Sequence, residues 1–457
     1  MEILSLVLFL VVCLFLLIGY PVALTLAGTS LVFAGIGIFF GAFDASYLLA
    51  TPSRLFGIVN NQTLIAVPLF VFMGVVLERS KIAEDLLVAM SGLLGRFKTG
   101  LGVSVVLVGM LLAASTGIVG ATVVTMGLLS LPTMLKHGYS PSLATGTICA
   151  TGTLGQIIPP SIALVLLGDV LSSAYQKAQL DMGIFSPDSV SVGDLFVGAL
   201  IPGLILVVFY LLYLWAVSKF SPSQVPAHGQ ESEHANLKEL LLALLPPLIL
   251  ITAVLGSILT GKATPTEAAG VGAIGSVILA LLKKTISVGN TKYVVRETTK
   301  VTSMVFLILI GASIFSLVFR GFGGEELLQA FFTDLPGGAF TAMLLVMIVI
   351  FLLGFILDFI EITFVVVPIV APILLMMGLD PIWLGIMIAV NLQTSFLTPP
   401  FGFALFYLRG VASDLVKTEQ IYKGVIPFII IQLVLLVVMA IWPEIITWLP
   451  SVVYDGN

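Results

Sequence analysis

Residues 132–160 read PTMLKHGYSPSLATGTICATGTLGQIIPP, and residues 372–400 read PILLMMGLDPIWLGIMIAVNLQTSFLTPP. The two stretches align at an offset of 240 residues and lie within apolar sequence. Each ends in a Pro–Pro pair, which removes backbone donors and interrupts a helix. Paired interruptions in the two halves of a membrane protein indicate the substrate and ion site of a secondary transporter. The alignment places Pro132, Gly138, Pro141, Pro159 and Pro160 on Pro372, Gly378, Pro381, Pro399 and Pro400.

The composition predicts an all-α integral membrane protein. Of the 457 residues, 59% are hydrophobic and 9% are charged, whereas soluble proteins carry about 25% charged residues. Apolar runs near the length of a membrane helix recur along the whole chain. The sequence contains neither a metal-ligand spacing nor a Walker A motif. We therefore expect no cofactor, no enzymatic activity, and contact with membrane lipid but not with nucleic acid.

The basic residues set the predicted topology. The strongest basic segment, 283–300, contains five Lys or Arg residues and one acid, so the positive-inside rule places it in the cytoplasm. Segments 79–98 and 409–423 are also basic and predicted to be cytoplasmic. The segment 171–194 is acidic and predicted to lie outside. These assignments require residues between 98 and 136 to enter the membrane and return on the same side.

The same logic in the second half gives a hairpin that enters from the opposite side. The sequence thus predicts an inverted repeat with two re-entrant helical hairpins and two broken helices. The first repeat, 1–218, contains scaffold helices 3–78, hairpin 100–136, broken helix 142–170 and spanning helix 195–217. A cytoplasmic linker, 219–238, leads to the second repeat, 239–457, with scaffold helices 240–319, hairpin 340–378, broken helix 382–408 and last helix 425–448.

The first hairpin turn, AASTGIVGATVVT (113–125), is small and rich in hydroxyl groups, as is the facing segment TGTLGQIIPPS (151–161). Exposed carbonyls and Ser or Thr oxygens are suitable ligands for Na⁺. Small residues also pack membrane helices closely, and each one alone is explained by packing. Taken together, the sequence predicts an oxygen-rich pocket from Ser115, Thr116, Gly117, Gly120, Thr122, Gly152, Thr153, Gly155 and Gln156.

The second hairpin turn, LDFIEIT (357–363), contains two acids in an otherwise apolar stretch. Asp358 and Glu361 share one helical face, and an intramembrane carboxylate costs about 3 kcal/mol, which favours a functional role. Alternatively, the two acids lie in water or cap a half-helix. The facing segment supplies Asn391, Gln393, Thr394, Ser395 and Thr398.

Two arginines lie close to apolar segments, Arg54 in TPSRLFGIVNNQT and Arg320 in FSLVFRGFGG. A guanidinium group can bind a carboxylate through two parallel hydrogen bonds. The alternative is that each side chain extends to the membrane interface. The sequence leaves both roles open.

The chain resembles the large membrane subunit of the TRAP transporters, the tripartite ATP-independent periplasmic family, over essentially its whole length. The resemblance rests on GTLGQIIPPS (152–161), NLQTSFLTPPFG (391–402), TPTEAAGVGA (264–273) and ASTGIVGAT (114–122). The segments LDFIEI (357–362) and SVSVGDLFVGALIPG (189–203) are similar to the mannitol/chloroaromatic subgroup of that family.

The resemblance implies an elevator-type transporter in the bacterial inner membrane, with multiple spans. Hairpins and broken helices would move against a scaffold, and Na⁺ would drive the import of an organic acid. It implies two partners: a periplasmic substrate-binding protein and a small four-helix membrane subunit, encoded as a separate chain.

The resemblance also implies the location of each site. The first sodium region would comprise Ser115, Thr116, Gly152, Thr153 and Gly155, beside Gly117, Gly120 and Thr122. The second would comprise Asp358, Thr363, Asn391, Gln393 and Thr398. Substrate would bind between them, near Gln156, Pro159, Pro160, Glu361, Thr394, Ser395, Pro399 and Pro400. The acids in the second hairpin depart from the family pattern, and they raise the alternative of proton coupling.

Three rival functions are considered. The first is a secondary transporter of another inverted-repeat family that acts alone. The second is a channel, which would be expected to show rings of charge or a repeated carbonyl filter, and neither is evident. The third is an intramembrane hydrolase, for which Asp358 and Glu361 would be the only suitable pair.

Overall fold

The computed structural model describes residues 2–227 and 237–454, and within these residues the regular structure is helical. The first part contains α1 (Glu2–Leu17), α2 (Val22–Phe39), α3 (Thr51–Val59), α4 (Ala66–Arg79), α5 (Ile82–Leu94), α6 (Gly100–Thr116), α7 (Val119–Lys136), α8 (Pro141–Thr153), α9 (Ile162–Asp181) and α10 (Val192–Phe220). Residues 228–236 of the predicted linker lie outside the described residues.

The second part begins at Leu237 and is also helical. It contains α11 (Leu237–Leu259), α12 (Pro265–Leu282), α13 (Val288–Gly321), α14 (Gly324–Thr333), α15 (Gly338–Leu353), α16 (Phe359–Val365), α17 (Val367–Met376), α18 (Pro381–Leu397), α19 (Phe403–Ala412), α20 (Thr418–Ile441) and α21 (Glu444–Tyr454).

The described helices include seven that are long and apolar enough to cross a membrane, and up to nine if two bent pairs each count as one span. The bent pairs are residues 45–59 with 63–79, at 54°, and α16 with α17, at 56°. A helix that crosses a membrane needs no polar face, because lipid solvates its apolar surface. The chain is therefore built as a multi-pass membrane protein.

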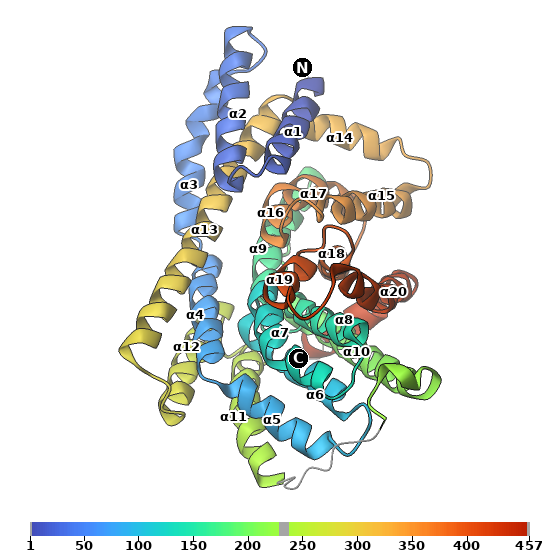
Figure 1. The fold of residues 1–457 in the computed structure, drawn as a ribbon. Coiled ribbons are helices and arrows are strands. Elements are labelled where there is room, and N and C mark those ends of the chain that lie inside the picture. Colours follow the sequence, from blue (N-terminus) through green and yellow to red (C-terminus); the bar gives the residue numbers. More distant parts are fainter. Residues whose placement is uncertain (1, 228–236, 455–457) are drawn as a thin grey trace.

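The helices form two groups, which Figure 1 shows on opposite sides of the molecule. In the first group, α13 packs along α2 and α4, and α12 packs against α4 and α11. In the second group, α8 packs on α6, α7 and α20, while α17 lies on α9 and α19 lies on α7. Contacts of α13 with α16 and of α4 with α6 join the groups. The two helix interruptions lie inside the second group.

Close helix approach in the second group depends on a pair of glycines. A Cβ atom on Gly146 of α8 would lie 2.0 Å from the carbonyl oxygen of Gly424 in α20. A Cβ atom on Gly424 would lie 2.0 Å from the Ser142 carbonyl oxygen. Small residues allow membrane helices to approach in this way, because packing replaces the hydrophobic effect as the driving force within lipid.

Some boundaries differ from the sequence expectation. The basic segment 283–300 is a loop only up to Ser287, since α13 begins at Val288 and includes Lys292, Arg296 and Lys300. Its 34 residues span about 50 Å, which exceeds the hydrocarbon thickness of about 30 Å, so the basic turns extend beyond the membrane core. Helix α9 likewise continues through Asp181, past the predicted end at residue 170.

Candidate functional site

The first helix interruption separates α8 from α9. Helix α8 ends at Thr153, a short 3₁₀ turn covers Leu154–Gln156, and α9 begins at Ile162. The predicted substrate residues Pro159 and Pro160 are joined by a cis peptide bond in this segment. The Ser161 hydroxyl donates to the carbonyl oxygens of Gly155 at 2.8 Å and Gln156 at 3.1 Å. A side chain thus satisfies carbonyls that a continuous helix would have paired.

The second interruption separates α18 from α19. Helix α18 ends at Leu397, the cis Pro399–Pro400 bond follows, and α19 begins at Phe403. The Thr398 hydroxyl donates to the Thr394 carbonyl oxygen at 2.8 Å. The Gly402 amide then donates to the Thr398 carbonyl oxygen at 2.9 Å, which closes the segment around the proline pair.

Hydrogen bonds join the two interrupted helices, and besides the contact of Cys149 Sγ in α8 with the Ala404 carbonyl oxygen in α19, at 3.8 Å, one of them links two side chains. The Gln393 amide nitrogen, Nε2, donates to Thr153 Oγ1 at 3.3 Å, and both residues are fully buried. Their separation of 240 residues equals the offset at which the two repeated segments align. Two positions that correspond in the repeated sequence therefore contact one another in space.

The turn of the first hairpin is neutral and closed by its own hydroxyl groups. Gly117 adopts a left-handed φ of +61°, and a Cβ atom there would lie 3.1 Å from the Ile162 nitrogen. The Thr116 and Thr122 hydroxyls hydrogen-bond to each other at 2.8 Å. The Ser115 and Thr116 hydroxyls each donate to the Leu112 carbonyl oxygen at 2.9 Å. The structure therefore brings these predicted ligands together.

Two of the predicted site glycines are in tight packing contacts. A Cβ atom on Gly120 would lie 2.9 Å from the Tyr407 ring, and one on Gly152 would lie 2.2 Å from the Val123 side chain. The packing interpretation therefore accounts for both residues. Gly155 differs, because its carbonyl oxygen accepts the Ser161 hydroxyl and lies in the interruption itself.

The turn of the second hairpin is closed by a capping box. Asp358 is the N-cap of α16, and its Oδ1 accepts from the Phe359 amide at 2.6 Å. Glu361 Oε2 accepts from the Asp358 amide at 2.9 Å. The two acids therefore cap α16, which is one of the two alternatives to a functional role. Glu361 is buried, with 7% of its surface exposed. Carboxylate oxygens hold several lone pairs, so a cap leaves capacity for a cation.

Two predicted residues of α18 tie that helix to α15 of the second hairpin. The Asn391 amide donates to the Met347 carbonyl oxygen at 2.8 Å, and the Ser395 hydroxyl donates to the Phe351 carbonyl oxygen at 2.7 Å. Thr394 donates within α18, to the Val390 carbonyl oxygen at 2.8 Å. The donor atoms of Asn391 and Ser395 thus hold hairpin and interrupted helix together, and the Asn391 side-chain oxygen is left for another contact.

Several buried oxygens near the interruptions have no hydrogen-bond partner among the described residues. They are Gln156 Oε1, Gln393 Oε1 and Thr363 Oγ1. Leaving a buried acceptor unpaired costs about 1–3 kcal/mol, and a bound cation would remove this cost. This chemistry fits a cation site at the interruptions.

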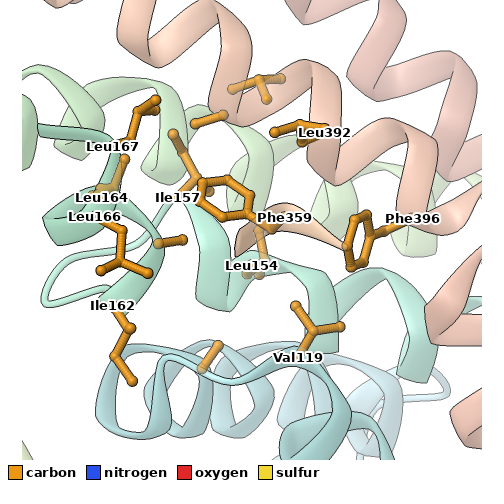
Figure 2. Packing of buried hydrophobic residues seen from close by; sticks show 14 of the residues in the cluster. Val119, Leu154, Ile157, Ile162, Leu164, Leu166, Leu167, Phe359, Leu392 and Phe396 are labelled. Carbon is orange, nitrogen blue, oxygen red and sulfur yellow. The ribbon is translucent and has the colours of Figure 1, made fainter. Parts of the chain in front are cut away.

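Apolar side chains surround this polar set. Figure 2 shows Leu154 and Ile157 of the first interruption close to Phe359 of the second hairpin, with Leu392 and Phe396 of α18 nearby. All five are buried in one core cluster. Because they exclude water, polar contacts among the oxygens are stronger than they would be at a surface.

Arg54 and Arg320 do not lie at the interruptions. Both line a cavity of about 370 Å³ between α3 and α13 on one side and α9, α16 and α17 on the other. Sequence reasoning missed Asp169, which lines the same cavity and accepts from the Asn61 amide at 2.9 Å. The sequence contained a signal for Asp169, because it is an acid inside the apolar run IALVLLGDV (162–170). Asp358 was selected by the same argument.

An ion-pair cluster lies at the end of this cavity. Glu325 of α14 accepts from Lys177 of α9 at 2.6 Å and from Arg320 of α13 at 2.8 Å. Burial raises the pKa of Glu325, but the hydrogen bonds and positive charges of Lys177 and Arg320 outweigh that effect, and the pKa lies below its ordinary value. Glu325 is therefore ionised at neutral pH and holds the two cations together.

Solved structures show the same overall fold. The YdaH transporter of Alcanivorax borkumensis superposes with a TM-score of 0.59 and 14% identity, covering 88% of this chain and 90% of that chain. The structure of MtrF from Neisseria gonorrhoeae, a member of a class of antimetabolite efflux pumps, gives a TM-score of 0.58 at 14% identity, covering 86% of this chain and 83% of that chain. At this identity the two superpositions show the fold alone, which is that of a helical membrane protein with interrupted helices.

The sequence profile described as "Tripartite ATP-independent periplasmic transporter, DctM component" matches residues 9–445, and the chain belongs to this family. A C4-dicarboxylate TRAP transporter large permease protein of Vibrio cholerae is 29% identical, with 97% of each chain covered. A sialic acid TRAP transporter large permease protein of the same organism is 26% identical, with 95% of each covered.

A third relative is the isethionate TRAP transporter permease protein DctMQ of Oleidesulfovibrio alaskensis. It is 30% identical over 71% of this chain and 48% of its own length. These relatives are transport permeases, and the chain is accordingly a large permease subunit of the bacterial inner membrane, not an enzyme. This membership excludes the rival transporter family, the channel and the hydrolase.

Proposed function

We propose that this chain is the translocating subunit of a Na⁺-coupled importer of organic acids. Its two hairpins and two interrupted helices hold Na⁺ and substrate, and a periplasmic binding protein delivers the substrate. The observation that carries the proposal is the contact between Gln393 and Thr153, because it joins the two interruptions at equivalent positions of the repeated sequence. A single site can then draw ligands from both repeats.

Sodium suits the residues that converge there. The unpartnered oxygens of Gln156, Gln393 and Thr363 are neutral, and the hydroxyl groups of the first hairpin add further neutral oxygens. Asp358 supplies a carboxylate close to the second interruption. One Na⁺ moving inward across about 100 mV contributes roughly 2.3 kcal/mol from the membrane potential alone. Each coupled ion therefore supports a substantial accumulation of substrate.

The relatives support the proposed class of substrate and the proposed partners. Their names specify C4-dicarboxylate, sialic acid and isethionate, each of which is an organic acid. The family description names a tripartite, ATP-independent periplasmic system. We accordingly propose two partners for this chain, a periplasmic substrate-binding protein and a small four-helix membrane subunit.

We further propose that transport proceeds by an elevator motion. The moving part would comprise α6–α9 and α15–α19, and the scaffold would include α2, α4, α12, α13 and α14. Lys177 of α9 contacts Glu325 of α14 across this boundary. A cleavable thiol cross-link between Lys177→Cys and Glu325→Cys, in a Cys13→Ala background, should stop uptake, and cleavage should restore it. Unchanged uptake by the cross-linked protein would contradict the motion.

The proposal as a whole is tested by uptake in proteoliposomes that contain this chain and its small partner. A panel of organic acids is supplied with and without the binding protein and with and without an inward Na⁺ gradient. We expect uptake only when both are present. Uptake without the binding protein would show a self-sufficient transporter, and uptake without the gradient would remove sodium from the mechanism.

A further inference from the structure

The cavity at the boundary between the two helix groups is rich in positive charge. Its scaffold wall carries Arg54 of α3 and Arg320 of α13, and the opposite wall carries Lys177 and Asp169 of α9. Its volume of about 370 Å³ is sufficient for a small organic molecule. By the predicted topology, the cavity lies in the outer half of the protein, away from the interruptions.

The acids at the cavity are already engaged. Both oxygens of Asp169 accept from the Asn61 amide, at 2.9 and 3.1 Å. Glu325 is shared between Lys177 and Arg320. Three cations therefore accompany two carboxylates at the cavity, and of these three cations Arg54 has no ion pair with the described residues.

Within residues 2–227 and 237–454, Arg54 makes one hydrogen bond, to the Ser313 carbonyl oxygen at 3.5 Å, a length at which the bond is weak. Arg320 adds a second free donor, because its Nε is buried and has no partner among the described residues. Arg54 and its hydrogen-bond partner Ser313 both line the cavity. A partly buried guanidinium group without a counterion favours an anion, and its planar donors match a carboxylate.

We propose that this cavity is a binding site for a small organic acid, with Arg54 as the group that binds the carboxylate. The site is separate from the interruptions and needs no sodium. The choice of a carboxylate as the anion rests on the proposed function. Because Arg54 and Lys177 stand on opposite walls, a bound acid contacts both helix groups and occupies the boundary between them.

The test places a thiol in the cavity. Ser316→Cys, on the α13 wall, is combined with Cys13→Ala, while the native Cys149 is fully buried. The protein is embedded in phosphatidylcholine nanodiscs, in a sodium-free choline buffer, and labelled with a neutral maleimide. Succinate is the probe, and uncharged succinamide is its control. At about ten times the Kd, succinate should slow labelling about tenfold, and succinamide should not.

The Arg54→Gln variant tests the assigned anchor. Removing one charged hydrogen-bonding partner should weaken protection by succinate about tenfold. Arg96→Gln, at an exposed position between α5 and α6, is the matched control and should protect normally. Ser451→Cys in α21 reports a surface thiol away from the cavity, and succinate should leave its labelling rate unchanged.

Three results would overturn the inference. The first is labelling of Ser316→Cys that succinate does not slow. The second is equal protection in Arg54→Gln and Arg96→Gln. The third is protection by phosphatidylglycerol in the nanodisc with no further effect of succinate, which would assign the cavity to a lipid phosphate. Because sodium is absent, none of these results depends on sodium-coupled uptake, so failure here is distinguishable from failure of the proposed function.

Discussion

Both hairpin turns reverse the chain next to a helix interruption, but different side chains close the two turns. The first turn, at Thr116–Gly117, carries no charge, and it is closed by a left-handed glycine and by hydroxyl groups. The second turn, at Asp358–Glu361, is closed by two carboxylates that cap α16. A chain can thus reverse next to a helix interruption either through backbone freedom or through charged caps. Only the second solution places a formal charge beside the proposed sodium site.

The largest expected effect comes from removing the backbone freedom of the first turn. In Gly117→Val, the left-handed conformation costs about 1–2 kcal/mol, and the contact with Ile162 adds about 1–3 kcal/mol. We expect a marked fall in the thermal unfolding midpoint in nanodiscs and complete loss of uptake. Gly183→Val is the control, because Gly183 has a φ of +83° but open space around it. Equal destabilisation of the two variants would remove the packing contribution from this account.

The second expected effect concerns the charge of the second turn. Asp358→Asn keeps a good N-cap but removes the negative charge. If the carboxylate binds Na⁺, its loss should raise the sodium concentration for half-maximal uptake by about tenfold or more, with little change in stability. Asp380→Asn, at the N-cap of α18, is the matched control. An unchanged sodium dependence in Asp358→Asn would leave capping as the sole role of Asp358.

The third expected effect compares one neutral ligand from each repeat. Thr153→Ala and Asn391→Ala should each retain expression, and each should need about fivefold more sodium for half-maximal stimulation, because one contact is lost. Thr147→Ala, in α8, controls for removing a buried threonine, since among the described residues the Thr147 hydroxyl bonds only to the Leu143 carbonyl oxygen of its own helix. Normal sodium stimulation in both variants would reject the assignment of ions to the interruptions.

The smallest expected effect concerns Glu325, a carboxylate outside the hairpins that serves as a reference for Asp358. Glu325→Gln removes both ion pairs at the outer end of the cavity, which are partly exposed and together contribute about 1 kcal/mol. Because the folded-state pKa of Glu325 is lowered, this stability is present above the ordinary pKa of about 4.3 and is lost as the pH falls through the folded value. The thermal unfolding midpoints of the wild-type protein and of Glu325→Gln should therefore differ at pH 7 and converge in acid.

Glu326→Gln is the control for that measurement, because Glu326 is exposed and next in sequence. It should leave the unfolding midpoint unchanged at every pH. A difference between wild-type protein and Glu325→Gln that grows in acid would contradict the lowered pKa. Glu325 could then no longer serve as the reference carboxylate with which Asp358 is compared.

The sequence predicted the features that depend on local chemistry. The Pro–Pro pairs indicated both interruptions, and the predicted first hairpin, 100–136, has the bounds of α6 and α7. The pattern Asp-x-x-Glu at Asp358 also contained the signal for a capping box, one of the two interpretations left open. Hydrogen-bonding groups only three residues apart find each other through local geometry, so such features can be read from spacing.

The sequence predicted which segments face each other at the hairpins, but it did not predict which residues of distant segments form hydrogen bonds or ion pairs. Asn61 and Asp169 are separated by 108 residues, and Lys177 and Glu325 by 148, so no local pattern relates them. The contact of Gln393 with Thr153 has the repeat offset of 240 as a signal, but the offset alone does not specify which equivalent positions meet. These pairings depend on how the two helix groups pack against each other. Small residues allow close packing of helices, but they do not specify one packing arrangement.

The central claim is that the two interruptions form one sodium-coupled site. The most direct measurement follows radioactive sodium into proteoliposomes that contain this chain, its small partner and the substrate-loaded binding protein. We expect sodium to enter with substrate, and at a sodium concentration half-maximal for the wild-type protein we expect Asn391→Ala to lower both fluxes while Thr147→Ala does not. Substrate uptake without any accompanying sodium entry would contradict the account.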